Sequence, residues 1–167
     1  KELTQEVLMK SLTSTVKTTS FIMIIIGCAS IISFVVQFIR LPEMLIGFVT
    51  QMNFSPYVVI AIFYILYILM GMLVDAVSMM VMTVPTILPT IVYLGFDPIW
   101  FSVVVTITCE IGLITPPVGL NLYILQGVSG SPLGEIARGD APFILALLIG
   151  LALFTTFPQL SLFLVNL

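Results

Sequence analysis

The sequence has no histidine, only two cysteines and few charged residues, with five Lys and Arg and eight Asp and Glu among 167 residues. Without histidine the chain lacks the commonest metal ligand in proteins and the usual general base. Cys28 and Cys109 lie in apolar runs, which is typical of small buried side chains and not of a disulfide or metal pair. A net charge of −3 without any basic cluster argues against a nucleic-acid partner.

The scarcity of charge also excludes an ordinary soluble domain. Charged residues make up 8% of the chain and hydrophobic residues 60%, whereas the surface of a soluble domain needs far more charge. The apolar residues run together instead of alternating, so the composition predicts an all-α integral membrane protein in a lipid bilayer and not a β-barrel. The chain starts on Lys1 without a methionine or a signal-peptide pattern, and we interpret it as a piece of a longer protein.

The first part of the chain contains one clear membrane span. Residues 1–17 are polar and mixed in charge, and we expect them to form a cytoplasmic amphipathic segment. Residues 18–39 supply about the twenty apolar residues that a bilayer requires, which predicts a transmembrane helix. Residues 41–56 carry scattered polar side chains and are predicted to form an interfacial connector.

The apolar region 57–94 is too long for one span and too short for two spans with an exposed loop, and it contains a single charge, Asp75. Two interpretations compete. Either a straight helix ends near Met82 and a second, short helix begins at Pro85, or the chain turns back at 73–76 as a re-entrant hairpin. A charge at the centre of a lipid-facing helix costs roughly 3 kcal/mol. Because that cost largely disappears at a hairpin tip that faces water or an ion, the hairpin is favoured.

A broken helix follows. Residues 99–128 would make a transmembrane helix if glycines and two adjacent prolines did not interrupt them at 112–118. Pro117 forces Pro116 away from the α region, and neither proline donates a backbone hydrogen bond. Non-helical backbone at membrane depth is tolerated only where protein or a watery cavity covers it, and such breaks form ion and substrate sites in secondary transporters. The simpler alternative is a proline kink or a tight loop between two helices.

The charges near the predicted spans give an orientation. Residues 129–140 are predicted to form a cytoplasmic loop, and residues 141–165 a last transmembrane helix. If the hairpin returns to the side from which it entered, only Arg40 lies outside. The other four basic residues then share the cytoplasmic side, as the positive-inside rule expects: Lys1, Lys10, Lys17 and Arg138.

Several motifs resemble the large membrane subunit of TRAP transporters (tripartite ATP-independent periplasmic transporters). The resemblance is carried by Gly71–Asp75, by Pro85 and Pro89, by the turn Gly95-Phe96-Asp97-Pro98, and above all by residues 112–122, Gly-Leu-Ile-Thr-Pro-Pro-Val-Gly-Leu-Asn-Leu. Together these motifs cover about 57–157. The chain looks like the C-terminal part of that subunit.

The resemblance implies one half of an inverted-repeat, elevator-type secondary transporter, in which each repeat contributes a re-entrant hairpin and a broken helix. It implies import of an organic acid, either a dicarboxylate or a sialic-acid-like molecule, coupled to sodium, and no enzyme activity. The implied partners are a small membrane subunit, a soluble periplasmic substrate-binding protein and the missing N-terminal part of the same subunit. The implied location is the inner membrane of a bacterium or an archaeon, as a multi-pass protein.

Within this framework a sodium site is expected where the hairpin tip and the break meet. Sodium prefers oxygen ligands, and carbonyl groups at an unwound helix supply them without the burial of several charges. The expected site comprises Asp75, Ala76, Gly112, Thr115 and Pro117, partly through backbone carbonyls. The alternative role for the carboxylate of Asp75 is to cap a helix.

Two further residues, Asn121 and Ser78, are candidates for substrate binding, although an interhelical hydrogen bond is the alternative role for Asn121. Glu110, one turn before the break, either lines the cavity or pairs with a residue of the missing half. No Arg or Lys lies at membrane depth, although arginine is the natural partner of a carboxylate. The charge of an acidic substrate would then be met by helix N-termini, by sodium or by the missing half.

Other functional classes fit the sequence less well. An intramembrane aspartyl protease needs two aspartates that face each other, whereas only Asp75 is central here and Asp97 lies at an interface. A channel or a structural membrane subunit, and another ion-coupled carrier of the same superfamily, stay open as alternatives.

Overall fold

The computed structural model describes residues 4–52 and 54–163, and every regular element in them is a helix. The prediction of an all-α protein is therefore confirmed. The helices of the described residues are α1 (Gln5–Phe38), α2 (Leu41–Met52), α3 (Pro56–Gly71), α4 (Ala76–Tyr93), α5 (Pro98–Ile114), α6 (Leu120–Ser129), α7 (Leu133–Thr156) and α8 (Gln159–Leu162).

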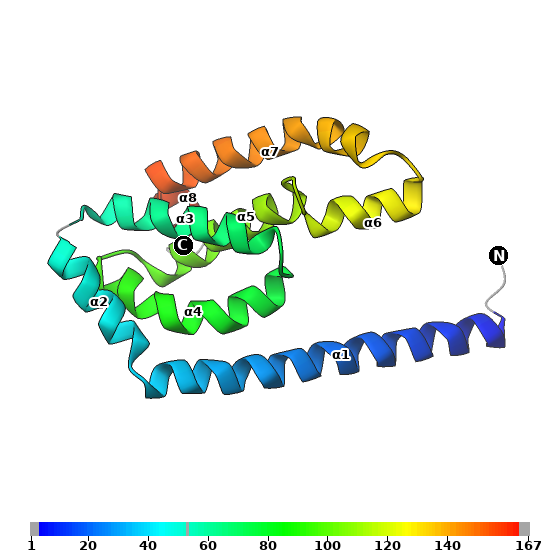
Figure 1. Ribbon diagram of the computed structural model, residues 1–167, viewed down its shortest axis with the longest axis horizontal. Helices are drawn as coiled ribbons and strands as arrows, with labels where there is room; N and C mark the ends of the chain where they lie inside the picture. The colour runs from blue at the N-terminus through cyan, green and yellow to red at the C-terminus, as the bar shows by residue number, and fades with distance from the viewer. Residues whose placement is uncertain (1–3, 53, 164–167) are drawn as a thin grey trace.

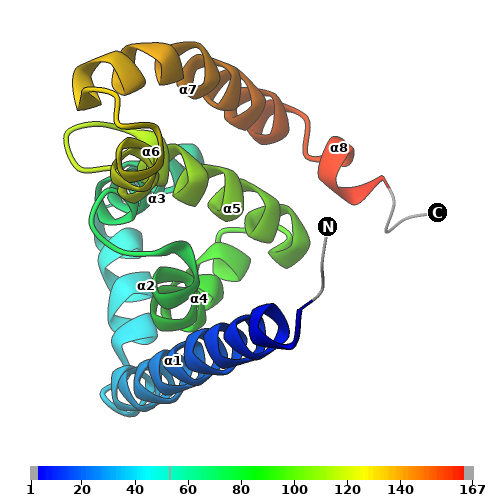
Figure 2. The same cartoon turned by 90° about the vertical axis from the view of Figure 1, so that its right-hand side faces the viewer.

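Most of the helices lie along the long axis of the molecule, and α2 crosses at one end (Figure 1). α1 and α4 run in the same direction, α3 runs opposite to them, and α5 and α6 follow each other in the direction of α3. The start of α1 and the α6–α7 turn lie at one end of the molecule, and the α1–α2 turn lies at the other. Seen along the long axis, α1 and α7 flank a central group that contains α3, α4 and α5 (Figure 2).

α1 is a single helix of 34 residues, which is about 51 Å long at 1.5 Å per residue. The sequence was expected to divide here into an amphipathic segment (1–17) and a span (18–39), but the helix passes through that boundary without a break. The physical reason is that no proline or glycine lies between Gln5 and Ile26 to interrupt it. The helix ends just before Arg40, which adopts a left-handed conformation with φ of 56°.

The core of the molecule is shared by α3, α4 and α5. Its largest fully buried side chains include Trp100, Tyr67, Phe101, Ile60, Met79 and Ile91. The hydroxyl of Tyr67 on α3 lies 2.8 Å from Oγ1 of Thr83 on α4. Thr83 donates its own proton to Met79 O at 2.7 Å, so Tyr67 is the donor of the pair. This hydrogen bond joins α3 and α4 inside apolar surroundings, where an unpaired hydroxyl would be costly.

Two prolines lie inside α4 without ending it. A proline lacks the N–H group that would donate to the carbonyl four residues earlier, so Pro85 leaves Val81 O without its helical donor. The hydroxyl of Ser33 on α1 donates to Val81 O at 3.0 Å. The carbonyl that the proline frees is therefore the point at which α1 is attached to α4.

A second freed carbonyl attaches α5 to α7. Pro158 follows the end of α7 and cannot donate to Phe154 O. The indole Nε1 of Trp100 on α5 donates to that oxygen at 2.7 Å. The side chain of Trp100 is 1% exposed, so this hydrogen bond also provides the partner that a buried indole needs.

Other boundaries differ from the expectations. The predicted connector (41–56) is mostly the helix α2, with residue 53 outside the described residues, and most of the predicted loop (129–140) belongs to α7. α7 ends at Thr156, whereas the predicted span was 141–165, because Pro158 cannot extend the helix. Residues 164–165 of that predicted span lie outside the described residues.

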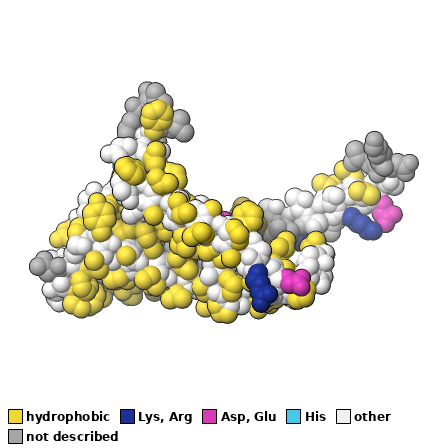
Figure 3. Space-filling view, turned by 90° about the horizontal axis from the view of Figure 1, so that it is seen from above, with side chains coloured by type: hydrophobic (Ala, Val, Ile, Leu, Met, Phe, Trp, Pro, Cys, Tyr) yellow, Lys and Arg dark blue, Asp and Glu magenta, His cyan; other side chains and the backbone are white. Residues whose placement is uncertain are grey.

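The outer surface is largely apolar. Large apolar side chains that are between 65 and 84% exposed include Phe21, Phe34, Phe38, Val128 and Phe143. Figure 3 shows this apolar surface, with most of the visible charged side chains toward one end. α1, α4 and α7 are long and apolar enough to cross a membrane. A surface of this kind fits lipid and not water, so the chain is a membrane protein.

The α3–α4 pair begins and ends at the same end of the molecule, which generates a test of membrane topology. Single cysteines at Ser55 and Tyr93, before and after this pair, are expected to be labelled from one face of the membrane, and a cysteine at Ser129 from the other. The measurement is labelling by an impermeant maleimide of cysteine-free full-length subunit in membranes. Labelling of Ser55→Cys and Tyr93→Cys from opposite faces would mean that α3 and α4 together cross the membrane once.

Candidate functional site

The broken helix is the first half of the candidate site. α5 ends at Ile114 and α6 begins at Leu120, and the peptide bond between Pro116 and Pro117 is cis. In a continuous helix the N–H groups of residues 116 and 117 would donate to the carbonyls of Gly112 and Leu113. Prolines have no such group, so the break is a direct result of the sequence.

The carbonyl groups around the break have different partners. Gly112 O accepts from the N–H of Thr115 at 3.2 Å, and the hydroxyl of Thr115 donates to Ile111 O. No backbone N–H of the described residues donates to the carbonyl oxygens of Leu113, Ile114 or Thr115. These three oxygens, like those of Pro116, Pro117 and Val118, therefore keep free capacity for a ligand.

Gly119 lies beside two of these oxygens. It has φ of 49°, and a Cβ atom added to it would lie 3.0 Å from Thr115 O and 3.2 Å from Leu113 O. Both the left-handed conformation and the lack of space require glycine here. The two carbonyl oxygens therefore lie close to one point of the backbone.

The turn between α3 and α4 is the second half of the site. Asp75 is the N-cap of α4: its Oδ2 accepts from the N–H of Ser78 at 2.9 Å, and its Oδ1 accepts from the hydroxyl of Ser78 at 2.6 Å. The capping role that was the alternative for Asp75 is thus present in the structure. The side chain is nevertheless exposed, so its carboxylate has lone pairs left for another partner.

A pair of glycines brings the two halves together. A Cβ on Gly112 of α5 would lie 2.8 Å from the Cα of Gly71 and 2.8 Å from Ile68 O, both on α3. A Cβ on Gly71 would lie 3.1 Å from Cys109 O and from the Cα of Gly112. α3 ends at Gly71 and α5 ends two residues after Gly112, so both helices stop where their backbones are closest.

The remaining candidates are spread around this contact. Ala76 begins α4 and is half-buried, and Ser78 is buried with its N–H and its hydroxyl both committed to Asp75. Pro117 is exposed within the break, and Asn121 is exposed in the first turn of α6. Glu110 is also exposed, and no ion pair to it occurs among the described residues.

Sequence reasoning expected backbone carbonyls of the break to bind the ion and named Gly112, Thr115 and Pro117, but it did not single out the carbonyl oxygens of Leu113 and Ile114. The signal was present, since the prolines at 116 and 117 remove the helical donor of Leu113 O. In the described part of the chain no group of three or more His, Cys, Asp and Glu lies close enough to hold a metal ion. A cation here would thus be held mainly by carbonyl and hydroxyl oxygens.

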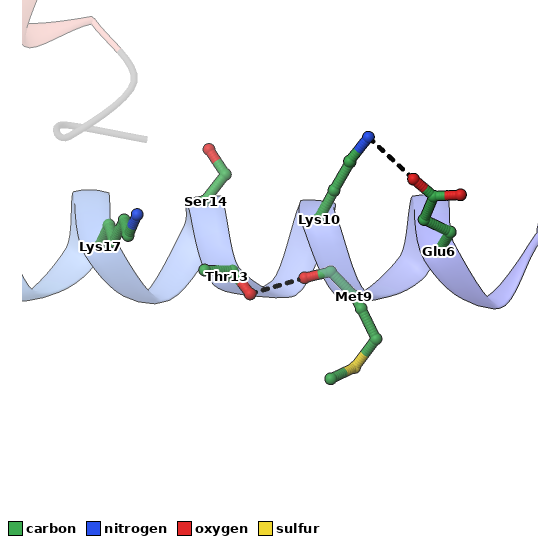
Figure 4. Close-up of a pocket in the computed structure, with 6 residues that line it drawn as sticks. All are labelled: Glu6, Met9, Lys10, Thr13, Ser14 and Lys17. Atoms are coloured by element: carbon green, nitrogen blue, oxygen red, sulfur yellow. Dashed lines mark hydrogen bonds and ion pairs between the residues drawn. The ribbon is translucent and has the colours of Figure 1, made fainter.

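A hollow at the start of α1 is not part of this site. It is lined by Glu6, Met9, Lys10, Thr13, Ser14 and Lys17, all on one helix (Figure 4). Lys10 Nζ lies 3.0 Å from Glu6 Oε1, and both side chains are exposed. An exposed ion pair along one helix contributes little to stability, and among the described residues no second element lines the hollow.

The comparison with known families assigns the chain. Residues 1–160 match the family model described as "Tripartite ATP-independent periplasmic transporter, DctM component". The chain belongs to this family. The resemblance to the large membrane subunit of TRAP transporters is thereby confirmed.

Curated relatives support the same family. The chain is 33% identical over 150 residues to the C4-dicarboxylate TRAP transporter large permease protein of Pseudomonas aeruginosa. This alignment covers 90% of the chain and 35% of the relative. It is 29% identical to the sialic acid TRAP transporter large permease protein of Vibrio cholerae, over 97% of the chain and 38% of the relative. It is 30% identical to the 2,3-diketo-L-gulonate TRAP transporter large permease protein of Escherichia coli, over 96% of the chain and 38% of the relative. The chain thus spans about a third of the length of these TRAP permeases.

The glycine contact generates a prediction about stability. Gly112→Ala places a methyl group against the backbone of α3, and we expect it to destabilise the subunit by about 1–3 kcal/mol, the range for an overpacked core. Gly150→Ala in α7 is the control, because nothing lies within 4 Å of its Cβ position and alanine favours a helix. The measurement is thermal unfolding of the full-length subunit in detergent. Equal midpoints for the two variants would show that α3 and α5 are not in backbone contact.

Proposed function

We propose that the chain is part of the membrane permease subunit of a sodium-coupled secondary transporter that imports an organic acid. The family supports transport as the activity. The named substrates of the relatives support the substrate class, since C4-dicarboxylates and sialic acid are carboxylates. In this proposal the acid is delivered by a periplasmic substrate-binding protein. The permease acts in a bacterial or archaeal inner membrane together with a small membrane subunit and the rest of its own chain.

The contact between Gly71 and Gly112 is the observation that carries the proposal. It holds the turn that contains Asp75 next to the break in α5–α6. A sodium ion bound there would use carbonyl oxygens near the break, where those of Leu113, Ile114 and Thr115 accept from no described backbone N–H. The carboxylate of Asp75 would offset the charge of the ion, while its hydrogen bonds to Ser78 keep it in place.

Ala76, Gly112 and Pro117 remain part of the proposed sodium site through their backbone. Gly112 O already accepts one hydrogen bond, but a carbonyl oxygen has a second lone pair. The hydroxyl of Thr115 donates to Ile111 O and could still offer its oxygen to the ion.

For the substrate we propose the start of α6. A helix N-terminus attracts a carboxylate, and Asn121 lies exposed in the first turn of α6 with an amide that can donate to it. Ser78 is a weaker candidate, because its hydroxyl proton is given to Asp75 and only its oxygen can accept. Release on the other side of the membrane would follow an elevator movement, in which α3, α4, α5 and α6 travel together.

The decisive experiment is uptake of a radiolabelled C4-dicarboxylate or sialic acid by vesicles that contain the complete transporter with its binding protein. We expect uptake only with an inward sodium gradient. Uptake at the same rate when choline replaces sodium would exclude sodium coupling. Equilibration without any ion gradient would indicate a channel.

The prolines of the break generate a second prediction. Pro116→Ala with Pro117→Ala supplies N–H groups that can donate to Gly112 O and Leu113 O and lets the helix close. We expect uptake to fall by more than about tenfold, since 1.4 kcal/mol of lost ion binding already corresponds to tenfold, while membrane insertion is preserved. The control is Pro142→Ala in α7, an exposed proline at which the chain is already helical. A loss of uptake in this control equal to that of the double variant would argue against a special role for the break.

The last prediction separates the two roles of Asp75. Asp75→Asn keeps a capping oxygen but removes the charge, and Asn and Asp cap helices about equally well. We expect a several-fold rise in the sodium concentration that gives half-maximal uptake, with normal expression. Asp97→Asn is a matched control, because Asp97 caps α5 at the end opposite the break by accepting from Ile99 and Trp100 N–H. Superimposable sodium titrations for the two variants would leave Asp75 with the capping role alone.

A further inference from the structure

The contact between α1 and α4 has two possible attachment points. Ser33 of α1 is buried and donates to Val81 O, the carbonyl that Pro85 leaves free. Pro89, one turn later, likewise lacks the N–H that would donate to Pro85 O. No side chain of the described residues donates to Pro85 O. The freed carbonyls of residues 81 and 85 are thus one helical turn apart on α4.

The two helices are parallel, so their turns match along the contact (Figure 1). Gln37 lies one turn after Ser33 on α1, and it lines the same cavity as Pro85 and Pro89. The carbonyls of residues 82, 83 and 84 have helical donors at 86, 87 and 88, none of which is a proline. Along this face of α4, only the carbonyls of residues 81 and 85 are therefore available to a donor from α1.

We propose that Ser33 and Gln37 are positioning residues that hold the α3–α4 pair in either of two registers along α1, one helical turn apart. In the observed register the hydroxyl of Ser33 donates to Val81 O, and Gln37, one turn later on α1, lines a cavity together with Pro85. In the second register α4 has moved by four residues, about 6 Å, along α1, and the hydroxyl of Ser33 donates to Pro85 O. The inference rests on the proposed transport function, because that function requires the α3–α4 pair to move against another part of the subunit.

The physical reason for two discrete registers is the apolar setting of the contact. Between them neither Val81 O nor Pro85 O would lie beside the hydroxyl of Ser33, and a carbonyl without a donor in apolar surroundings has a cost in free energy. The neighbouring contact residue on α1 is Ala29, which is small and buried and does not resist sliding. The two registers are therefore stable positions, and the states between them are not.

Disulfide cross-linking tests the registers directly. Ala29 and Val77 each lie one turn before Ser33 and Val81, so Ala29→Cys with Val77→Cys reports the observed register. Ala29→Cys with Val81→Cys reports the second register. A shift of one turn takes paired Cα atoms beyond the roughly 7 Å that a disulfide allows. The experiment uses the otherwise cysteine-free complete transporter in membranes, with and without sodium and substrate.

We expect both pairs to cross-link, with a ratio that changes between the two conditions. Cross-linking of the first pair alone in all conditions would overturn the proposal. This result does not depend on which ion drives transport. Failure of sodium coupling in the uptake assay therefore leaves the cross-linking test intact, and the two proposals can fail separately.

Pro89→Ala is the second test. The new N–H would occupy Pro85 O within α4 and remove the acceptor of the second register, while the bond from Ser33 to Val81 O stays. We expect the maximal uptake rate to fall about two- to tenfold, as for the loss of one hydrogen bond, with the half-saturating substrate concentration unchanged. The cross-link between positions 29 and 81 should weaken. Pro142→Ala, an exposed proline inside α7, is the control, and identical kinetics for the two variants would refute the proposal.

Discussion

A backbone carbonyl in apolar surroundings needs a donor, and the prolines of this chain decide which carbonyls lack one. Pro85 frees Val81 O for Ser33, and Pro158 frees Phe154 O for Trp100. Each of these two carbonyls accepts a hydrogen bond from a side chain of another helix. The hydrogen bond missing within one helix is thus replaced by a hydrogen bond between two helices. The packing of α1 on α4 and of α5 on α7 depends on this requirement.

The break between α5 and α6 follows the same rule with a different outcome. Its two prolines free the carbonyls of Gly112 and Leu113; Thr115 N–H pairs the first, and no described backbone group pairs the second or the carbonyls of Ile114 and Thr115 that follow. Their neighbour is the turn before α4, which is held there by the close approach of α3 and α5. A membrane protein can keep unpaired oxygens at such a place only where other protein covers them or where water, an ion or a substrate contacts them. The carbonyl oxygens of the break that lack a backbone donor thus lie close together.

Local features of the sequence predicted local features of the fold. The break was predictable because Pro116 and Pro117 act on their own neighbours, and the all-α class followed from composition. The contact between Gly71 and Gly112 was not predictable, because it joins residues far apart in the chain and glycine marks close approach only in a known fold. α1 runs through residue 17 and α7 begins before residue 141, although the sequence is polar at both places, because polar residues alone do not end a helix.

The glycine contact also makes this region stiff. With no room for even a methyl group between the two backbones, α3 and α5 cannot move closer, and the hydrogen bonds of each helix resist bending away. Oxygen ligands positioned by these two helices cannot adjust their distances to cations of different radius. A cation site beside this contact would therefore discriminate between cations by ionic radius. A cation of the wrong radius would strain α3 and α5, because the ligands could not rearrange to relieve that strain.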